Sequence, residues 1–288
     1  MFAGHDPGVC AYGVRALALG IAGRAKGVRP ALDTGLALAT SLQHPLTLAF
    51  SQSIACFAMH IVRDSHGCGE FAEQLMKVSA KYDFPITRAV GSFMLGAAQA
   101  LQGDLTPALK QMEPSFEATL SYGFLGVLPG VIMAETLASA DRDREALALV
   151  IRLLDESITP EGAVFIPELW RIRGEILLRQ AAINSPEAQR YFETALRIAD
   201  KQGARLSYLR AGIPLARLLA EGGRREEAKA ILDHANANTL GEWDGPEISS
   251  LPNCARILTR YNRHNFVAGM LGFEVPGKLL ATAADVIE

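Results

Sequence analysis

Apolar residues recur at intervals of three and four positions along most of the chain. Phe192, Ala195, Leu196 and Ala199 show this spacing, which places their side chains on one face of an α-helix. The alternation of apolar and polar residues that is typical of a half-buried strand is not sustained. Turn-forming Gly, Pro, Asp and Asn residues interrupt the helical spacing roughly every 15 to 20 residues. The pattern therefore predicts about twelve helices joined by short turns.

A second, longer period is superimposed on the helical one. In its clearest form, a small residue is followed by a large one four positions later and by another small one after three more, as in Ala188, Phe192 and Ala195. Related triplets begin at Ala31, Ala72, Ala108, Ala146 and Ala228. Successive copies are 36 to 42 residues apart. A period of this length is typical of repeats that consist of two antiparallel helices.

The first helix of each predicted pair carries a small residue of its own. It precedes the alanine of the second helix by twelve residues in three copies and by fourteen in another. These small residues are Gly96, Ala134, Ala216 and, at the longer spacing, Gly174. Two helices can cross closely only where their side chains are small. The sequence therefore predicts an all-α fold, a tetratricopeptide-like α-solenoid of about six helical hairpins.

Helix boundaries follow from capping residues and prolines. Asp6 followed by Pro7 is typical of a helix start, and Gly103 and Gly203 fall where helices must end. Pro114 and Pro214 fall inside predicted helices, where we expect bends or shifted boundaries.

The repeat pattern fades after about residue 240. We therefore predict a tetratricopeptide-like helical repeat array over residues 1–242. Residues 243–288 are expected to form a C-terminal capping helix, within 248–261, and an irregular tail.

Composition and charge exclude several classes of protein. Hydrophobic residues make up 49% of the 288 residues, which is too many for a disordered chain. The 28 Lys and Arg residues nearly balance the 31 Asp and Glu residues, for a net charge of −3. A dedicated nucleic-acid-binding protein usually has a strongly basic face, so we expect no nucleic-acid partner.

The cysteine content and hydropathy favour a cytoplasmic protein. Four cysteines are too few for a disulfide framework, which favours a reducing compartment. The longest apolar stretch, residues 124–134, is far shorter than the roughly 20 residues that span a bilayer, so no membrane segment is expected. Residues 9–23 are apolar but fit the repeat register, and Arg15 interrupts them. We interpret them as a helix of the array rather than as a signal peptide.

Four stretches carry a resemblance to a known family. They are FAGHDPGV at residues 2–9, HPLTLAF at 44–50, ELWRIRGE at 168–175 and the segment 188–204. Together they resemble the C-terminal helical-repeat region of large bacterial signalling proteins. In those proteins, a class III adenylate/guanylate cyclase domain or another output domain is followed by an ATPase domain and then by tetratricopeptide-like repeats. The resemblance extends over about residues 2–260 and implies a regulatory sensor or scaffold region.

The catalytic motifs of that family have no counterpart in this chain. The phosphate-binding pattern G-x-x-x-x-G-K-[ST] does not occur, and residues 20–26 do not meet its spacing. There are no metal-binding aspartates in the context of a cyclase domain. We therefore expect no catalytic, cofactor-binding or metal-binding residues and no cofactor. The chain would correspond to the repeat region alone, or to a remnant of it.

Ligand-type residues gather in the sequence at one place. His60, Asp64, His66, Cys68 and Glu70 could hold zinc or iron only if three or four of them converged. The alternative, which we favour, is a polar turn between helices with His60 at the helix crossing and Cys68 exposed. His5 and Asp6 are adjacent and could suggest acid–base chemistry, but a helix cap accounts for Asp6.

The repeat geometry predicts a concave surface lined by the first helix of each hairpin. Counting from the motif positions places seven candidate groove-binding residues on this surface: Phe57, Phe93, Glu135, Arg171, Glu175, Arg210 and Arg217. Aromatic residues and arginines are typical anchors of binding surfaces. The alternative is that the aromatic residues pack between repeats and that the charged residues are solvated.

These observations favour a non-catalytic helical-repeat domain for interaction or sensing. Its concave groove would bind a protein or peptide segment or a small effector. In the parent architecture it would pass that signal to the cyclase or ATPase domains. Two enzymatic alternatives remain: a part of a nucleotide cyclase whose catalytic domain is absent from this chain, and a metal-dependent enzyme that uses the His60–Glu70 cluster.

Overall fold

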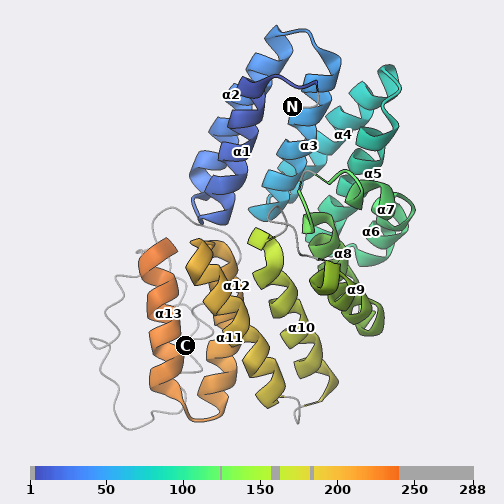
Figure 1. Ribbon diagram of the computed structural model, residues 1–288. Helices are drawn as coiled ribbons and strands as arrows, with labels where there is room; N and C mark the ends of the chain where they lie inside the picture. The colour runs from blue at the N-terminus through green and yellow to red at the C-terminus, as the bar shows by residue number, and fades with distance from the viewer. Residues whose placement is uncertain (1–3, 124, 157–162, 182–184, 240–288) are drawn as a thin grey trace, which may run out of the picture.

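The computed structural model describes residues 4–123, 125–156, 163–181 and 185–239 (Figure 1). Within these ranges the fold is all-α and has no strand. The predicted C-terminal capping helix and tail over 243–288 lie outside the described residues. The helices are α1 (Pro7–Ile21), α2 (Val28–Ser41), α3 (Pro45–Ile61), α4 (Ser65–Lys81), α5 (Pro85–Leu101), α6 (Leu105–Met112), α7 (Phe116–Leu120), α8 (Leu128–Ser139), α9 (Asp143–Glu156), α10 (Ile166–Gln180), α11 (Ser185–Gln202), α12 (Arg205–Glu221) and α13 (Arg225–Thr239).

Neighbouring helices pack in pairs, as Figure 1 shows. The pairs are α1 with α2, α3 with α4, α5 with α6, α8 with α9, α10 with α11 and α12 with α13. The short helix α7 is an addition between the third and fourth pairs, and it packs against α5. The first helices also contact one another in chain order, and α12 contacts α1. The row of first helices therefore brings the two ends of the described chain together.

The small residues of the repeat lie where the helices of a pair cross. Ala108 and Ala188 have no exposed surface. A Cβ atom on Gly96 would lie 2.6 Å from Cγ of Met112, and one on Gly174 would lie 2.8 Å from Cε1 of Phe192. Real Cβ atoms do not approach other atoms so closely, so a larger residue would separate the helices. This confirms the prediction that small residues mark close crossings.

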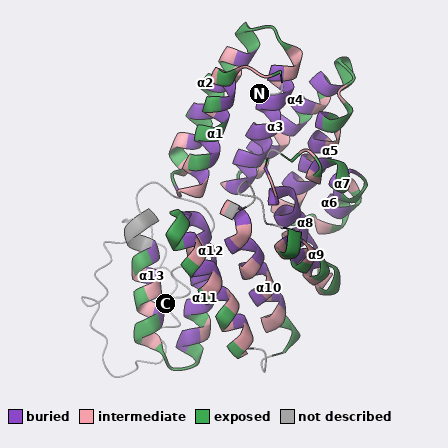
Figure 2. Cartoon of the chain, in the orientation of Figure 1, coloured by how far each residue is buried: buried purple, intermediate pink, exposed green. Residues whose placement is uncertain are grey.

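Burial differs between the first and second helices of the pairs, as Figure 2 shows. Nearly every residue of α3 from Ala49 to Ile61 is buried, because α3 is packed by α1, α2, α4 and α5. α11 buries only one stripe of its surface, with members such as Ala188, Phe192 and Ala195. Its opposite face is exposed. The first helices are therefore the interior elements of the fold.

A left-handed backbone conformation recurs at the turns between helices. In the first part of the chain it falls every 20 residues, at Gly23, Gln43, Arg63, Asp83, Gly103 and Gly123, with φ between 50° and 92°. L-residues with a side chain rarely adopt this conformation, whereas glycine does so without steric cost. Each helix and its turn thus occupy 20 residues, which accounts for the period of about 40 residues per pair.

Caps and prolines define the ends of several helices. Asp6 caps α1, as expected, and its Oδ1 accepts a hydrogen bond of 3.0 Å from the backbone N of Val9. His44 caps α3, which the sequence did not predict, and its Nδ1 accepts from the backbone N of Thr47. At Pro114 the helix gives way to a short 3₁₀ turn, which confirms a shifted boundary. At Pro214 the expectation of a shifted boundary is wrong, because α12 continues through it.

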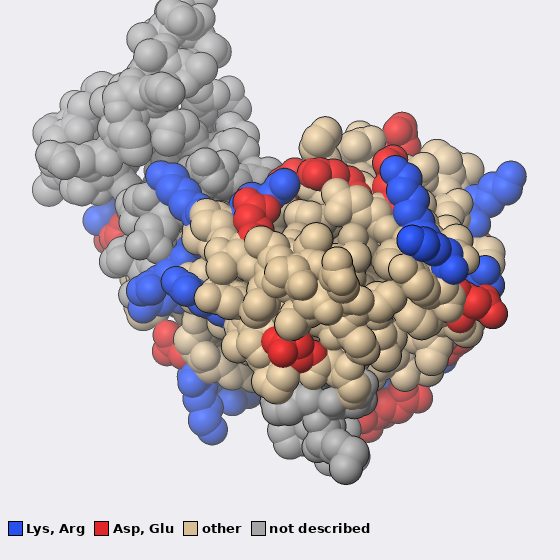
Figure 3. All heavy atoms as spheres, turned by 90° about the horizontal axis from the view of Figure 1, so that it is seen from above, with Lys and Arg blue, Asp and Glu red and all other residues tan. Residues whose placement is uncertain are grey.

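The surface carries no dominant charge on the face shown in Figure 3. Side chains of both signs lie in small groups, mostly towards its edges, with uncharged residues between them. Across the described helices, none is both long and apolar enough to cross a membrane.

The turn conformation gives a matched pair of stability predictions. Gln43 is exposed and has φ 50°, and Gly103 has φ 92° and open space around its Cβ position. Gln43→Gly should relieve about 1–2 kcal/mol of backbone strain. Glycine adds entropy to the unfolded chain that offsets about 0.5–1 kcal/mol of this gain. We expect Gln43→Gly to raise the free energy of unfolding in urea and Gly103→Gln to lower it, each by about 0.5–1 kcal/mol. Changes of the opposite sign would contradict this account of the turns.

Candidate functional site

The candidate site lies where helices from both ends of the described chain meet. The last turns of α1 and α3 face α10 and α12 there, and α8 lies beside them (Figure 1). Nη2 of Arg210 in α12 donates a hydrogen bond of 2.8 Å to the carbonyl oxygen of Ile61 in the last turn of α3. This bond joins residues 149 positions apart in the chain. It therefore ties the sixth pair of helices to the second.

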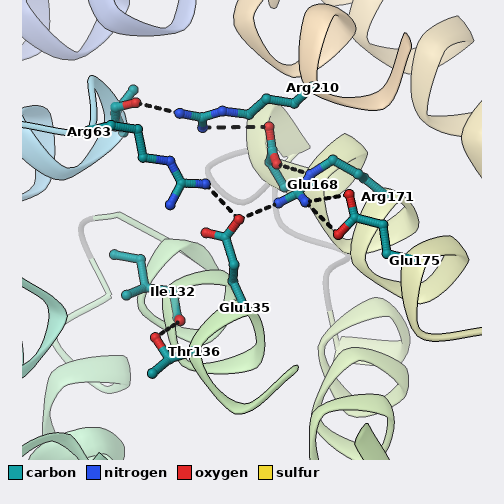
Figure 4. A network of polar contacts seen from close by, with 9 residues as sticks. Arg63, Ile132, Glu135, Thr136, Glu168, Arg171, Glu175 and Arg210 are labelled. Atoms are coloured by element: carbon teal, nitrogen blue, oxygen red, sulfur yellow. Dashed lines mark hydrogen bonds and ion pairs between the residues drawn. The ribbon is translucent and has the colours of Figure 1, made fainter. Parts of the chain in front are cut away.

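Ion pairs connect the helices around this bond (Figure 4). Nη2 of Arg63, in the turn after α3, lies 2.6 Å from Oε1 of Glu135 in α8. The same oxygen lies 2.9 Å from Nη2 of Arg171 in α10. Nε of Arg171 donates to Oε2 of Glu168 at 2.7 Å, and its Nη1 donates to both carboxylate oxygens of Glu175 at 2.9 and 3.0 Å. Arg171 is thus held by three glutamates.

Arg210 completes the network. Its Nη1 lies 3.9 Å from Oε1 of Glu168, which is an ion pair but too long for a hydrogen bond. With Arg63 and Arg171, it gives three arginines that face three glutamates. We call these six residues the arginine–glutamate network: Arg63, Glu135, Glu168, Arg171, Glu175 and Arg210.

Burial makes the charges of the network depend on one another. Glu168 and Arg171 are only 4% and 5% exposed. Burial opposes ionisation of Glu135, but Arg63 and Arg171 outweigh it and hold its pKa well below the usual range. Burial likewise opposes ionisation of Glu168, and Arg171 and Arg210 still lower its pKa. The carboxylates therefore stay ionised only while the arginines are in place.

A small cavity lies under the network. It measures about 30 Å³ and is lined by His60, Glu135, Glu168 and Arg210, with apolar residues that include Ile132. This is room for about one water molecule. Burial of His60, together with the positive charge of Arg63, lowers its pKa to about 3. His60 is consequently neutral at pH 7.

A larger pocket opens to solvent on the other side of the network. Its volume is about 230 Å³. It is lined by Arg63, Arg171, Glu175, Arg210, Ile213, Pro214 and Arg217. Glu135 and Glu168 do not line it. We call this space the arginine pocket.

Five of the seven candidate groove residues converge here. Glu135, Arg171, Glu175 and Arg210 belong to the network, where they are paired rather than solvated, and exposed Arg217 lines the arginine pocket. Phe57 and Phe93 do not converge with them. Both have no exposed surface and lie in the core, so the expectation that they face a groove is corrected. Their positions on the first helices were counted properly, but neighbouring helices cover them.

Three residues of the site were not assigned from the sequence. Arg63 follows a helix end, where the repeat register gives no face to a side chain. Glu168 lies in the stretch that carries the family resemblance, but nothing in its spacing marks it as buried. His60 was considered only as a metal ligand or a residue at a helix crossing. The useful signal was the density of Arg and Glu between residues 168 and 175.

The ligand-type cluster around His60 disperses in the structure. Oδ1 of Asp64 caps α4 by accepting from the backbone N of Gly67 at 2.8 Å. His66 and Glu70 line a separate surface pocket. Cys68 lies inside α4 with no exposed surface, so the expectation of an exposed cysteine in a turn is wrong. Across the described ranges, no three His, Cys, Asp or Glu side chains are grouped so that they could hold a metal ion.

Comparison of the chain with protein-family models gives no match, and comparison with curated proteins gives none either. The site is therefore interpreted from its own geometry.

The pKa of His60 gives a testable dependence of stability on pH. The unfolded chain takes up a proton on His60 near pH 6.5, whereas the folded chain does so only near pH 3. Stability must therefore fall as the pH falls between these values, by at most about 1.4 kcal/mol per unit. We expect His60→Gln to reduce the slope of unfolding free energy against pH between pH 6.5 and 5, measured in urea. His66→Gln, at an exposed position, should keep the wild-type slope. An unchanged slope in His60→Gln would contradict the assignment.

Removal of the central arginine should destabilise the fold strongly. Arg171→Met leaves Glu135 and Glu168 without their principal partner in a buried place, which should cost about 3–5 kcal/mol in free energy of unfolding. Arg197→Met, on the exposed face of α11, should change it by about 0.5 kcal/mol or less. Adding Glu168→Gln to Arg171→Met should restore part of the loss. Equal effects of the two arginine variants in urea denaturation would refute the proposed role of Arg171.

Proposed function

We propose that this chain is a non-catalytic helical-repeat domain that binds a protein segment or a small effector. Its architecture would be a tetratricopeptide-like α-solenoid of six hairpins. The resemblance of its sequence to the regulatory repeat region of cyclase–ATPase signalling proteins supports a role in signal transduction. In that setting, the partner would be a peptide segment or the cyclase and ATPase domains of the parent protein.

One observation carries this proposal. The first helices of the second, fourth, fifth and sixth pairs, or the turns after them, contribute side chains to one charged site. A ligand in the arginine pocket would touch residues of the second, fifth and sixth pairs at once. Because a ligand shifts an equilibrium only through contacts that differ between states, a site that joins distant pairs is well placed to sense a partner.

The chemistry of the site supports binding rather than catalysis. The network arginines and glutamates hold one another, and His60 is neutral and has a lowered pKa. Cys56 and Cys68 are buried, and burial raises the pKa of both thiols, which opposes their use as nucleophiles. Of the two enzymatic alternatives, neither is favoured by a specific observation among the described residues.

A binding experiment tests the proposal through an exposed residue of the pocket. The purified chain is used to capture the separately expressed output or ATPase domain that is encoded beside it, and affinity is measured by calorimetry. Arg217→Glu reverses a charge at the pocket without touching the core, and we expect it to weaken binding by about tenfold. Arg197→Glu is the matched control and should bind like the wild type. Equal affinities of all three proteins would remove the pocket from the binding surface.

The purified chain should also show no turnover of ATP or GTP with Mg²⁺. Cyclic nucleotide is measured by chromatography, and phosphate release by a coupled assay. A signal that persists at constant specific activity through purification would contradict the non-catalytic proposal.

A further inference from the structure

The arginine pocket presents an unusual set of charges to solvent. Four of its seven lining residues are arginines, and Glu175 is its only lining carboxylate. Glu135 and Glu168 neutralise part of this charge, but they lie outside the lining. A molecule in the pocket would therefore face four guanidinium groups and a single carboxylate.

The arginines are held in place before any ligand arrives. Arg63 is fixed by Glu135, and Arg171 is fixed by Glu135, Glu168 and Glu175. Arg210 is fixed by its bond to the carbonyl oxygen of Ile61. A ligand would pay little entropy for ordering these side chains, which favours binding at a preformed site.

Arg217 supplies the charge that the network does not balance. It lies on the same face of α12 as Arg210, seven residues or about two turns further on. It is exposed, and within the described part of the chain it has no ion-pair partner. The six network residues are balanced, three arginines against three glutamates. Arg217 therefore gives the pocket its surplus positive charge.

The size of the pocket limits the ligand. Its 230 Å³ is less than the roughly 300–1,000 Å³ of sites that enclose drug-sized molecules. Ile213 and Pro214 form an apolar part of its wall. The space suits one compact anionic group with a small apolar or polar substituent.

We propose that the arginine pocket binds the phosphate group of a small phosphomonoester. A phosphate group carries a charge of about −1.5 to −2 at pH 7 and three strong acceptor oxygens, which several arginines can share. A carboxylate has one charge and two oxygens, which a single arginine satisfies. The inference rests on the proposed function in one respect, since it names the ligand class for the same inner site.

Glu175 has a distinct part in this arrangement. It receives two hydrogen bonds from Nη1 of Arg171 and is the carboxylate that a phosphate would meet. Its side chain is 33% exposed, so it can move into solvent. Phosphate and Glu175 therefore compete for Nη1 of Arg171, and removal of the negative charge of Glu175 should favour the phosphate.

The test is a calorimetric titration of the full chain with inorganic phosphate and with glycerol phosphate at constant ionic strength. We expect saturable binding of both. Arg217→Gln should weaken it by about fivefold or more, and Glu175→Gln should strengthen it by a similar factor. Arg197→Gln is the matched control on α11 and should bind like the wild type. Circular dichroism and urea unfolding verify that each variant is folded.

Three results would overturn the inference. They are an absence of saturable phosphate binding, equal affinity of Arg217→Gln and Arg197→Gln, and tighter binding of succinate than of phosphate. Failure here is distinct from failure of the proposed function, because this titration needs no protein partner. Phosphate binding without capture of a partner domain would refute only the partner, and capture without phosphate binding would refute only the ligand class.

Discussion

The close approach of paired helices is the constraint on which the rest of the structure depends. Gly96 against Met112, Gly174 against Phe192 and Gly130 against Leu153 leave no room for a Cβ atom. These contacts fix the crossing within pairs, and turns with one left-handed residue fix the passage from one helix to the next. Because nearly the same geometry is repeated from pair to pair, small rotations accumulate. By the sixth pair, α12 has returned to contact α1.

This return accounts for the composition of the interior. Apolar side chains fill the spaces within and between neighbouring pairs, but the place where distant pairs meet is occupied by ion pairs. Burial of a charge is costly, and the attraction between buried opposite charges compensates only when the geometry is good. Arg171 satisfies that condition, because one guanidinium reaches three carboxylates. The charged site thus makes the contact between distant pairs depend on a specific arrangement, which an apolar contact would not require.

Local features were predictable from the sequence, and distant ones were not. The period of the alanines and the cap at Asp6 depend on residues within one pair or one turn, and the structure confirms both. The repeat register placed Phe57 and Phe93 on the right helices, but it contains no measure of how deeply a neighbour covers them. The pairing of Arg63 with Glu135 joins residues 72 positions apart, and no periodicity within a repeat contains that distance. Glu135, Arg171, Glu175 and Arg210 were identified because they share the inner face, although their mutual pairing was not foreseen.

Arg63 shows how the turn and the site constrain the same residue. Its φ of 60° is a conformation that favours glycine, and equivalent turns have Gly23 and Gly103. An arginine there costs about 1–2 kcal/mol of backbone strain. Its guanidinium, however, pairs with Glu135 and lines the arginine pocket, which no glycine could do. The strain is therefore located where the backbone of the α3–α4 turn and the charge of the site belong to one residue. Any displacement of that turn must alter the ion pair, and any change in the pairing of Arg63 must act on the turn.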